Sequence, residues 1–401
     1  MSRLMKSLLV SGLGLFTLCI GITFAENSSS AQAAKNKMCI VYDIGGRGDL
    51  SFNDMAALGG EAVVKAGIAA QVVEAQSKSE SDYLPNLRNL SRAGDCVLIV
   101  AVGFLLTDAV KTVADEFPKQ NYGLIDGFLD TKKNVLSVLF KENEGSALVG
   151  ALASLIAIEN KAPAVGLILG LEIPVLWKFE IGYKWGVRWA RDMMRAALGN
   201  AQLAGPKVLW NYTGTFNDPA KGKSATEVQL NQGAIAVYNV AGATGLGIFE
   251  ATEAKAKSAK REMGPPFGIG VDANQDYLKP GFIIASMIKR VDQGVLIAAK
   301  LSKEGKFRGG ILELGLTDRG ISISRLDDLQ TFLELGIKAG TVKASDRNSI
   351  YAKVKQMRES LPTYIWSMVD LLEQLIRSNK IQVPKVITQE ELKKWRSELD
   401  K

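Results

Sequence analysis

A repeated alternation of short apolar runs with amphipathic stretches is the feature that most constrains this chain. Runs such as "MCIVYDI" and "CVLIVAVG" are apolar almost throughout, and each is followed by a longer stretch with helical spacing, such as "DMAALGGEAVVKAGI". Continuously apolar strands joined by helices are typical of a parallel sheet that is covered on both faces. The sequence therefore predicts an α/β fold built on doubly wound parallel sheets.

The alternation of apolar runs with amphipathic stretches occurs in two successive rounds along the chain. The first round ends with "VLSVLF" and the second begins with "EGSALVGALASLIAIEN", with no Pro- or Gly-rich linker between them. A length of 401 residues, 47% of them apolar, is enough for two or three domains. We expect two α/β lobes in one chain.

Beyond about residue 325 the pattern changes to amphipathic helices. "LPTYIWSMVDLLEQLIRSNKI" has helical spacing, and "TQEELKKWRSELDK" begins with Thr388 as an N-cap and acidic residues in the first turn. We expect residues 326–401 to be a C-terminal helical extension. It either packs on the main body or contacts a partner.

Several functional classes are excluded by composition. The chain has no histidine, which removes Ser-His and Cys-His nucleophile pairs and His-ligated metal sites. Its three cysteines have no CxxC spacing, so zinc and thioredoxin-like sites are not indicated. The net charge of +7 is spread without a long basic block, which does not favour nucleic-acid binding. We expect no enzyme activity and no cofactor.

The first residues have the pattern of an export signal. Arg3 and Lys6 precede an apolar stretch, and a small, polar segment follows it. We expect residues 1–37 to be a signal peptide and spacer of a protein exported to the periplasm or cell envelope. The alternative is a lipoprotein signal in which "FTLC" presents Cys19 for lipidation, although Leu18 departs from the usual small residue there.

Two further cysteines, Cys39 and Cys96, each open a predicted strand. In an exported protein they face an oxidising compartment, which makes a disulfide conceivable. Small apolar cysteines are common in cores, so we favour two buried free thiols.

The carboxyl ends of the predicted strands carry aromatic, acidic and amide residues. In open parallel sheets, ligands bind outside these ends, and two facing lobes form a cleft there. The segments concerned are 43–53, 102–108, 125–126, 170–179, 211–218, 241–245 and 271–272.

Motifs in a fixed order carry a family resemblance. "GGRGDLSFND", "LIDG", "LFKENEGSALVGALA", "NYTGTFNDPAKGK", "IGVDANQDYL" and "SMIKRVD" follow one another as they do in the basic membrane protein (Bmp) family, typified by PnrA-like purine nucleoside receptors. The chain resembles this family over residues 38–325. Members are substrate-binding proteins of ABC transporters with the type I periplasmic-binding-protein fold. The helical extension and the poor lipobox are departures from the family.

The resemblance implies a chain that crosses three times between two lobes around a hinge cleft. Lobe 1 would comprise residues 38–138 and 288–308, and lobe 2 residues 139–287 and 309–325. It implies a monomer that binds purine nucleosides of the adenosine, guanosine and inosine class. The nucleoside would be handed to ABC permease and ATPase subunits, with no nucleic acid involved.

The resemblance also assigns the ligand-binding residues. Phe52 and Phe216, on opposite lobes, would stack on the two faces of the base. Without the resemblance, each Phe is equally well explained as a core residue that anchors its loop.

The expected polar contacts are Asn53 and Asp126 on the base edge, and Asp272 and Lys289 on the ribose hydroxyls. The alternative for Asn53 is helix N-capping. The alternative for Asp272 and Lys289 is an ion pair that ties crossing segments together.

Secondary candidates are Asp49, Phe104, Phe179 and Gly242, the last of which would let backbone approach the sugar. Asp49 ends an Arg-Gly-Asp tripeptide, but a turn at a strand's carboxyl end points into the cleft and not outward as an adhesion loop does. Two alternative functions are a ligand-sensing or surface-adhesion protein and, less favoured, a nucleoside hydrolase that uses Asp49 and Asp126. The chain lacks the clustered acids of a calcium site that such a hydrolase needs.

Overall fold

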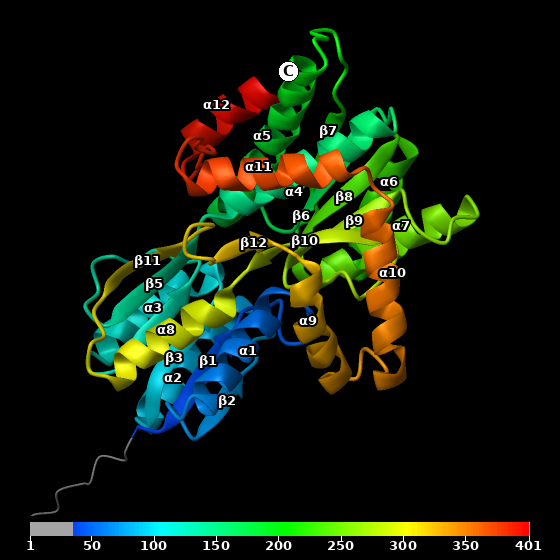
Figure 1. Ribbon diagram of the computed structural model, residues 1–401. Helices are drawn as coiled ribbons and strands as arrows, with labels where there is room; N and C mark the ends of the chain where they lie inside the picture. Colours follow the sequence, from blue (N-terminus) through cyan, green and yellow to red (C-terminus); the bar gives the residue numbers. More distant parts are fainter. Residues whose placement is uncertain (1–34, 401) are drawn as a thin grey trace, which may run out of the picture. The chain divides into compact units, whose positions relative to one another are not determined.

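Two six-stranded sheets lie within residues 35–400, the part of the chain that the computed structural model describes (Figure 1). The strands of the first sheet are β1 (Lys37–Tyr42), β2 (Gln71–Ala75), β3 (Cys96–Val102), β4 (Tyr122–Ile125), β5 (Val135–Phe140) and β11 (Gly310–Leu314). Their order is β2-β1-β3-β4-β5-β11, and every neighbouring pair is parallel.

Helices cover both faces of the first sheet: α1 (Phe52–Lys65) and α8 (Val291–Lys303) on one, and α2 (Tyr83–Ala93) and α3 (Thr107–Glu116) on the other. In β1, Met38 and Ile40 join the core under α1 and α8, whereas Cys39 and Val41 join the core under α2 and α3. Successive strand residues point to opposite faces, so a strand buried on both faces is apolar at every position.

The strands of the second sheet are β6 (Ala164–Leu169), β7 (Lys207–Tyr212), β8 (Ala234–Val240), β9 (Phe267–Asp272), β10 (Ile283–Lys289) and β12 (Ile321–Ile323). Their order is β7-β6-β8-β9-β10-β12. The first five are parallel, and β12 pairs antiparallel with β10. The predicted doubly wound α/β class is confirmed.

Four helices flank this sheet: α4 (Glu142–Glu159), α5 (Pro174–Ala197), α6 (Pro219–Asn231) and α7 (Gly245–Ser258). The backbones of α4 and α5 approach closely because glycines lie at their crossing. A Cβ at Gly150 would lie 2.3 Å from the Tyr183 carbonyl oxygen, and one at Gly186 would lie 2.1 Å from that of Ala147. Short 3₁₀ turns occur at η1 (Glu80–Asp82), η2 (Phe104–Leu106), η3 (Gly242–Thr244) and η4 (Ala344–Asp346).

We call each sheet with its helices a lobe. The chain passes between lobes after β5, after β10 and between β11 and β12. Assigning residues 309–325 wholly to lobe 2 is wrong for β11, which pairs with β5 in the first sheet (Gly310 with Leu136). Assigning Ile288 and Lys289 to lobe 1 is also wrong, because both belong to β10 of the second sheet. β11 is an edge strand whose partner lies far away in the sequence, so its own residues do not reveal its sheet.

The C-terminal extension consists of α9 (Leu326–Lys338), α10 (Arg347–Glu359), α11 (Thr363–Arg377) and α12 (Gln389–Leu399). It packs on the main body: α11 contacts α4, and α12 contacts α5 (Figure 1). The buried stripe of α11 is Ile365, Val369, Leu372 and Ile376, at helical spacing. The Thr388 side chain accepts a hydrogen bond from the Glu391 amide, which confirms the predicted N-cap.

The two cysteines in the first sheet form a disulfide, so the favoured prediction of free thiols was wrong. Cys39 and Cys96 lie in adjacent parallel strands with their Cα atoms 5.8 Å apart, a separation that suits a disulfide. Their spacing of 57 residues did not indicate that β1 and β3 would be neighbours.

The expected signal peptide and Cys19 lie outside the described residues. Within residues 35–400, no helix has the length and apolarity required to cross a membrane.

Candidate functional site

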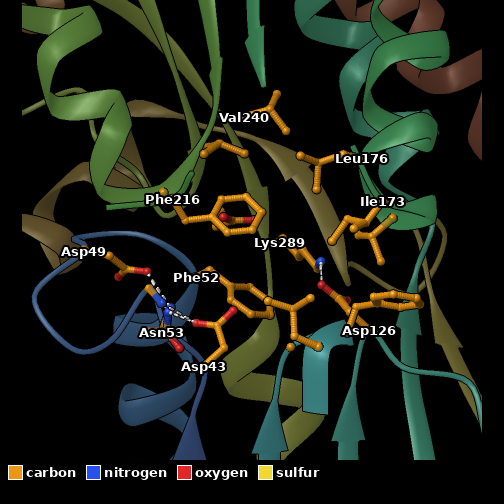
Figure 2. A pocket seen from close by; sticks show the side chains of 18 of the residues that line it. Asp43, Asp49, Phe52, Asn53, Asp126, Ile173, Leu176, Phe216, Val240 and Lys289 are labelled. Atoms are coloured by element: carbon orange, nitrogen blue, oxygen red, sulfur yellow. Dashed lines mark hydrogen bonds and ion pairs between the residues drawn. The ribbon is translucent and has the colours of Figure 1, made fainter. Parts of the chain in front are cut away.

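A cavity lies between the two lobes at the carboxyl ends of the strands (Figure 2). It contains about 620 Å³ of space free of atoms, part of it open to solvent. All of the predicted binding residues line this one cavity, and their roles in binding stay predictions. They are Asp49, Phe52, Asn53, Phe104, Asp126, Phe179, Phe216, Gly242, Asp272 and Lys289.

The two aromatic side chains proposed to hold the base reach this cavity from different lobes. Phe52 begins α1, and Phe216 lies in the loop between β7 and α6; both point into the cavity (Figure 2). Gly170 makes room for Phe216, because a Cβ there would lie 2.2 Å from the Phe216 ring. Both rings remain partly exposed, so neither is a buried core residue.

A buried ionic cluster forms one wall. The Lys289 Nζ donates to Asp126 Oδ2 at 2.6 Å and lies 2.9 Å from Glu142 Oε1. The Lys178 ammonium also contacts Glu142 and donates to the Phe140 carbonyl oxygen at 2.9 Å. Lys289 ends β10 in lobe 2, whereas Asp126 follows β4 in lobe 1, so the cluster joins the lobes.

Two members of this cluster, Lys289 and Glu142, are held in their charged forms in spite of burial, whereas burial raises the pKa of the Asp126 carboxyl. Burial disfavours the ammonium, but Asp126 and Glu142 raise the pKa of Lys289 well above its ordinary value. Burial likewise acts against the Glu142 carboxylate, yet Lys178 and Lys289 hold its pKa below the usual range. The direct Asp272–Lys289 ion pair considered from the sequence is replaced by Lys289 contacts with Asp126 and Glu142.

Two carboxylates at the cavity occupy the left-handed backbone region. Asp126 has φ +65° and Asp272 has φ +63°. Such conformations cost on the order of 1 kcal/mol for a residue with a side chain and concentrate at functional sites. Asp126 Oδ1 is buried without a hydrogen-bond partner. Asp272 Oδ2 accepts from the Ser51 hydroxyl at 2.9 Å, and burial raises the pKa of Asp272 to about 6.

The loop before α1 is organised by Asp49. Its carboxylate accepts from the backbone amides of Ser51 and Asn53 at 2.9 Å and of Asp54 at 3.1 Å, so the Asp49 side chain binds the first amides of α1, whose N-cap residue is Ser51 and not Asn53. The side-chain nitrogen of Asn53, Nδ2, donates to Asp43 Oδ1 at 3.0 Å and to Asp49 Oδ2 at 3.2 Å. Asn53 Oδ1 is buried and has no partner. Burial raises the pKa of Asp43 to about 6 and that of Asp49 to about 7.

This arrangement excludes the adhesion interpretation of the Arg-Gly-Asp tripeptide. Asp49 is only 2% exposed and is engaged by backbone amides, so a partner protein cannot reach its carboxylate. Arg47 is paired with Asp54 in the first turn of α1.

The remaining candidates contribute in different ways. Phe179 lies in the second turn of α5, with its ring 5.6 Å from Lys289 Nζ. Phe104 belongs to η2 after β3. Gly242 has φ +55°, and a Cβ there would lie 3.2 Å from the Phe216 carbonyl oxygen, so this glycine accommodates the Phe216 loop.

Three polar residues of the site were missed. Asp43 directly follows β1 and lines the cavity, and its place after a buried apolar run could have singled it out. Glu142 and Lys178 lie within α4 and α5, and their pairing with Lys289 depends on how the helices pack. Apolar lining residues were also missed: Ile173, Val175, Leu176, Val240 and Val271.

Carboxyl groups outnumber ammonium groups around the cavity. Four acidic residues and one lysine, Lys289, line the cavity, and the Lys289 ammonium already contacts the carboxylates of Asp126 and Glu142. Such a site suits a neutral ligand that offers N–H and O–H donors and opposes a phosphate, since like charges repel strongly when desolvated. The acidic lining residues are Asp43, Asp49, Asp126 and Asp272.

A family model described as "ABC transporter substrate-binding protein PnrA-like" (Bmp) matches residues 36–344. The chain belongs to this family. An uncharacterized lipoprotein of Pyrococcus abyssi is 35% identical over 403 residues, which covers 100% of this chain and 97% of that protein. The ABC transporter nucleoside-binding protein BmpA of Lactococcus lactis is 34% identical over 315 residues, 75% of this chain and 84% of its own length.

The solved structures agree with the fold of this PnrA-like protein. An ABC transporter solute-binding protein from Aeropyrum pernix K1 has 35% sequence identity and a TM-score of 0.81, covering 91% of this chain and 99% of that one. The resemblance and the periplasmic-binding fold are therefore confirmed. The PnrA-like protein is a substrate-binding protein of an ABC transporter and not an enzyme.

Proposed function

We propose that this PnrA-like protein binds a purine nucleoside in the interlobe cavity and delivers it to a membrane permease. The supporting observation is the pairing of two aromatic side chains from opposite lobes, Phe52 and Phe216, around one cavity. A flat heterocycle between the rings would gain stacking energy of about 1–3 kcal/mol per aromatic contact.

The base edge would face the two unpartnered acceptors. Asn53 Oδ1 and Asp126 Oδ1 are both buried and without hydrogen-bond partners. An unpaired buried acceptor costs about 1–3 kcal/mol, which a ligand N–H would recover. Purines offer ring and exocyclic N–H groups for this purpose. The BmpA relative of Lactococcus lactis is named as a nucleoside-binding protein, which is consistent with this ligand class.

The ribose would lie beside Asp272 and Lys289. Asp272 keeps one carboxylate oxygen beyond its bond to Ser51, and a carboxylate can accept from two adjacent hydroxyls. A 5′-phosphate would be repelled by the acidic lining, so we expect nucleosides and not nucleotides.

Ligand binding would couple to lobe movement. The lobes contact each other through Ser51 and Asp272 and through the Asn217 side chain, which donates to the Ile44 carbonyl oxygen at 3.3 Å. Three chain crossings provide the hinge. A nucleoside bridging both lobes would favour the closed form that a permease recognises.

We further infer that the protein is exported and anchored to the membrane. Its first residues have a signal-peptide pattern, and the Pyrococcus abyssi relative is named a lipoprotein. Cys19 is the candidate for lipidation.

The test is calorimetric titration of the protein lacking residues 1–34 with adenosine, guanosine, inosine, the free bases and inosine 5′-monophosphate. We expect micromolar or tighter binding of at least one nucleoside and at least 100-fold weaker binding of the monophosphate. No heat with any nucleoside would disprove the proposed ligand class. Equal binding of inosine and its monophosphate would disprove the electrostatic argument alone.

A further inference from the structure

An arginine from the C-terminal extension reaches the interior of lobe 2. Arg358, near the end of α10, is only 7% exposed. Its Nη2 donates to Asp276 Oδ2 at 2.6 Å and to the Ser324 hydroxyl at 2.7 Å, and its Nε donates to the Ile284 carbonyl oxygen at 3.2 Å. A single side chain of the extension therefore joins the loop after β9, strand β10 and the end of β12.

Asp276, the residue that Arg358 binds, is itself hydrogen-bonded within the loop after β9. The Ser286 hydroxyl donates to Asp276 Oδ1 at 2.7 Å and accepts from the Gln275 amide at 2.9 Å. The Asp276 amide donates to Asn274 Oδ1 at 3.1 Å. Asn274, Gln275, Asp276 and Ser286 are all fully buried. Residues 274–276, which we call the β9 loop, are thus held by side chains and not by a regular ladder.

The β9 loop contacts lobe 1 next to the cavity. Gln275 Nε2 donates to the Leu50 carbonyl oxygen at 3.0 Å, and its Oε1 accepts from the Val271 amide at 2.9 Å. Asp272, two residues before the loop, accepts from Ser51 of lobe 1. The segment that Arg358 holds therefore carries both a cavity carboxylate in a strained conformation and an interlobe hydrogen bond.

We propose that Arg358 is a positioning residue for the ligand site, which holds Asp276 so that the β9 loop presents Asp272 to the ligand and Gln275 to lobe 1. The ligand part of this inference rests on the proposed nucleoside function. The hydrogen-bond partners of the Arg358 side chain, Asp276, Ser324 and Ile284, do not line the cavity, and Arg358 lies outside the region that the family model matches. The C-terminal extension is then a working part of the binding site and not an appendage.

Arg358 has a geometry that lysine cannot copy. Its planar guanidinium meets a carboxylate, a hydroxyl and a carbonyl at once, whereas an ammonium is a point charge. The ring of Trp366 also lies 5.5 Å from its guanidinium carbon. Arg358→Lys should therefore keep the charge but loosen the loop.

The experiment compares three full-chain variants. Arg358→Met with Asp276→Asn removes the ion pair without leaving a buried charge unpaired, which guards against unfolding. Arg358→Lys is the conservative variant. Leu372→Ala is the matched control, because Leu372 is a fully buried residue of α11 in the core shared with α4, and its loss destabilises the protein away from the β9 loop.

Two readouts separate positioning from general stability. Hydrogen exchange of the Gln275 and Val271 amides, without ligand, reports the loop directly, since both donate to side chains of this network. Titration with inosine, adenosine and guanosine reports the site. We expect the double variant to exchange these amides at least tenfold faster than Leu372→Ala and to bind nucleoside about tenfold more weakly, with Arg358→Lys in between.

Exchange rates and affinities within twofold of those of Leu372→Ala would overturn the proposal, as would a faster loop with unchanged affinity. If the unmodified protein bound no nucleoside, the proposed function would fail instead. The exchange rates alone would then decide whether Arg358 holds the loop.

Discussion

The Cys39–Cys96 disulfide offers a test whose size follows from chain geometry. The bond joins β1 to β3 at the centre of the first sheet, and both cysteines are fully buried. Reduction leaves two thiols of nearly the same volume, so the packing of the core changes little. The main effect is on the unfolded chain, which loses a cross-link.

The magnitude follows from the closed loop of 57 residues. The loop-closure entropy of such a cross-link is about −14 cal/mol/K, so breaking it should lower the free energy of unfolding by about 4 kcal/mol at 25 °C. This is a large part of the 5–15 kcal/mol typical of folded proteins. Ligand affinity should stay within twofold, because neither sulfur lies at the cavity.

The effect is measured by guanidinium unfolding of three samples. They are the oxidised protein, the protein reduced in denaturant and refolded under reductant, and the Cys39→Ala/Cys96→Ala variant. Far-UV circular dichroism follows both lobes. Tryptophan fluorescence follows only lobe 2 and the extension, which hold all six tryptophans. We expect the dichroism midpoint to fall on reduction, with the fluorescence midpoint falling less. Unchanged dichroism midpoints, or a loss confined to fluorescence, would refute the reasoning. The tryptophans are Trp177, Trp185, Trp189, Trp210, Trp366 and Trp395.

Three further predictions concern the site and its anchoring. Phe52→Ala and Phe216→Ala should each weaken nucleoside binding about 5- to 150-fold by calorimetry. Phe307 is half-buried and lies outside the cavity, so the control Phe307→Ala should not weaken binding. Equal affinities for all three variants would disprove the stacking hypothesis. Burial raises the pKa of Asp272 to about 6 from an unfolded value near 4, so the folded state binds more protons than the unfolded state between these pH values. The free energy of unfolding of the wild type should therefore fall, relative to that of Asp272→Asn, by roughly 1–3 kcal/mol as pH rises from 4 to 7 in denaturant titrations. A difference that does not change with pH would contradict this. Cys19→Ser should abolish labelling by a fatty-acid analogue in cells that make lipoproteins, and retained labelling would exclude that site.

Much of the architecture could be predicted because it depends on local patterns of apolar and polar residues. A strand buried on both faces must be apolar throughout, so β1, β3 and β6 could be recognised by their own residues. The carboxyl ends of parallel strands meet at one edge, so loops far apart in sequence could be assigned to one cleft. Helix α12 could be predicted in the same way, because the Thr388 cap and the acids that follow it act within one turn.

Other features depend on contacts between segments far apart in the sequence, and the residues of one segment do not indicate which other segment it contacts. Whether Cys39 and Cys96 bond depends on which strands are neighbours, and β11 belongs to the first sheet only because β5 offers it an edge. Lys289 contacts Asp126 and Glu142 because the end of β10 lies next to the residue that follows β4 and next to the start of α4.

The sequence by itself determined the class of fold and the helical nature of the tail, because hydrophobic periodicity is a short-range property, and its family motifs singled out residues that line one cavity. Only the tertiary structure decided that Arg358 of the tail binds Asp276 behind the cavity. Side-chain direction and distance across 82 residues of chain are set by the packing of the whole core, which no local pattern encodes.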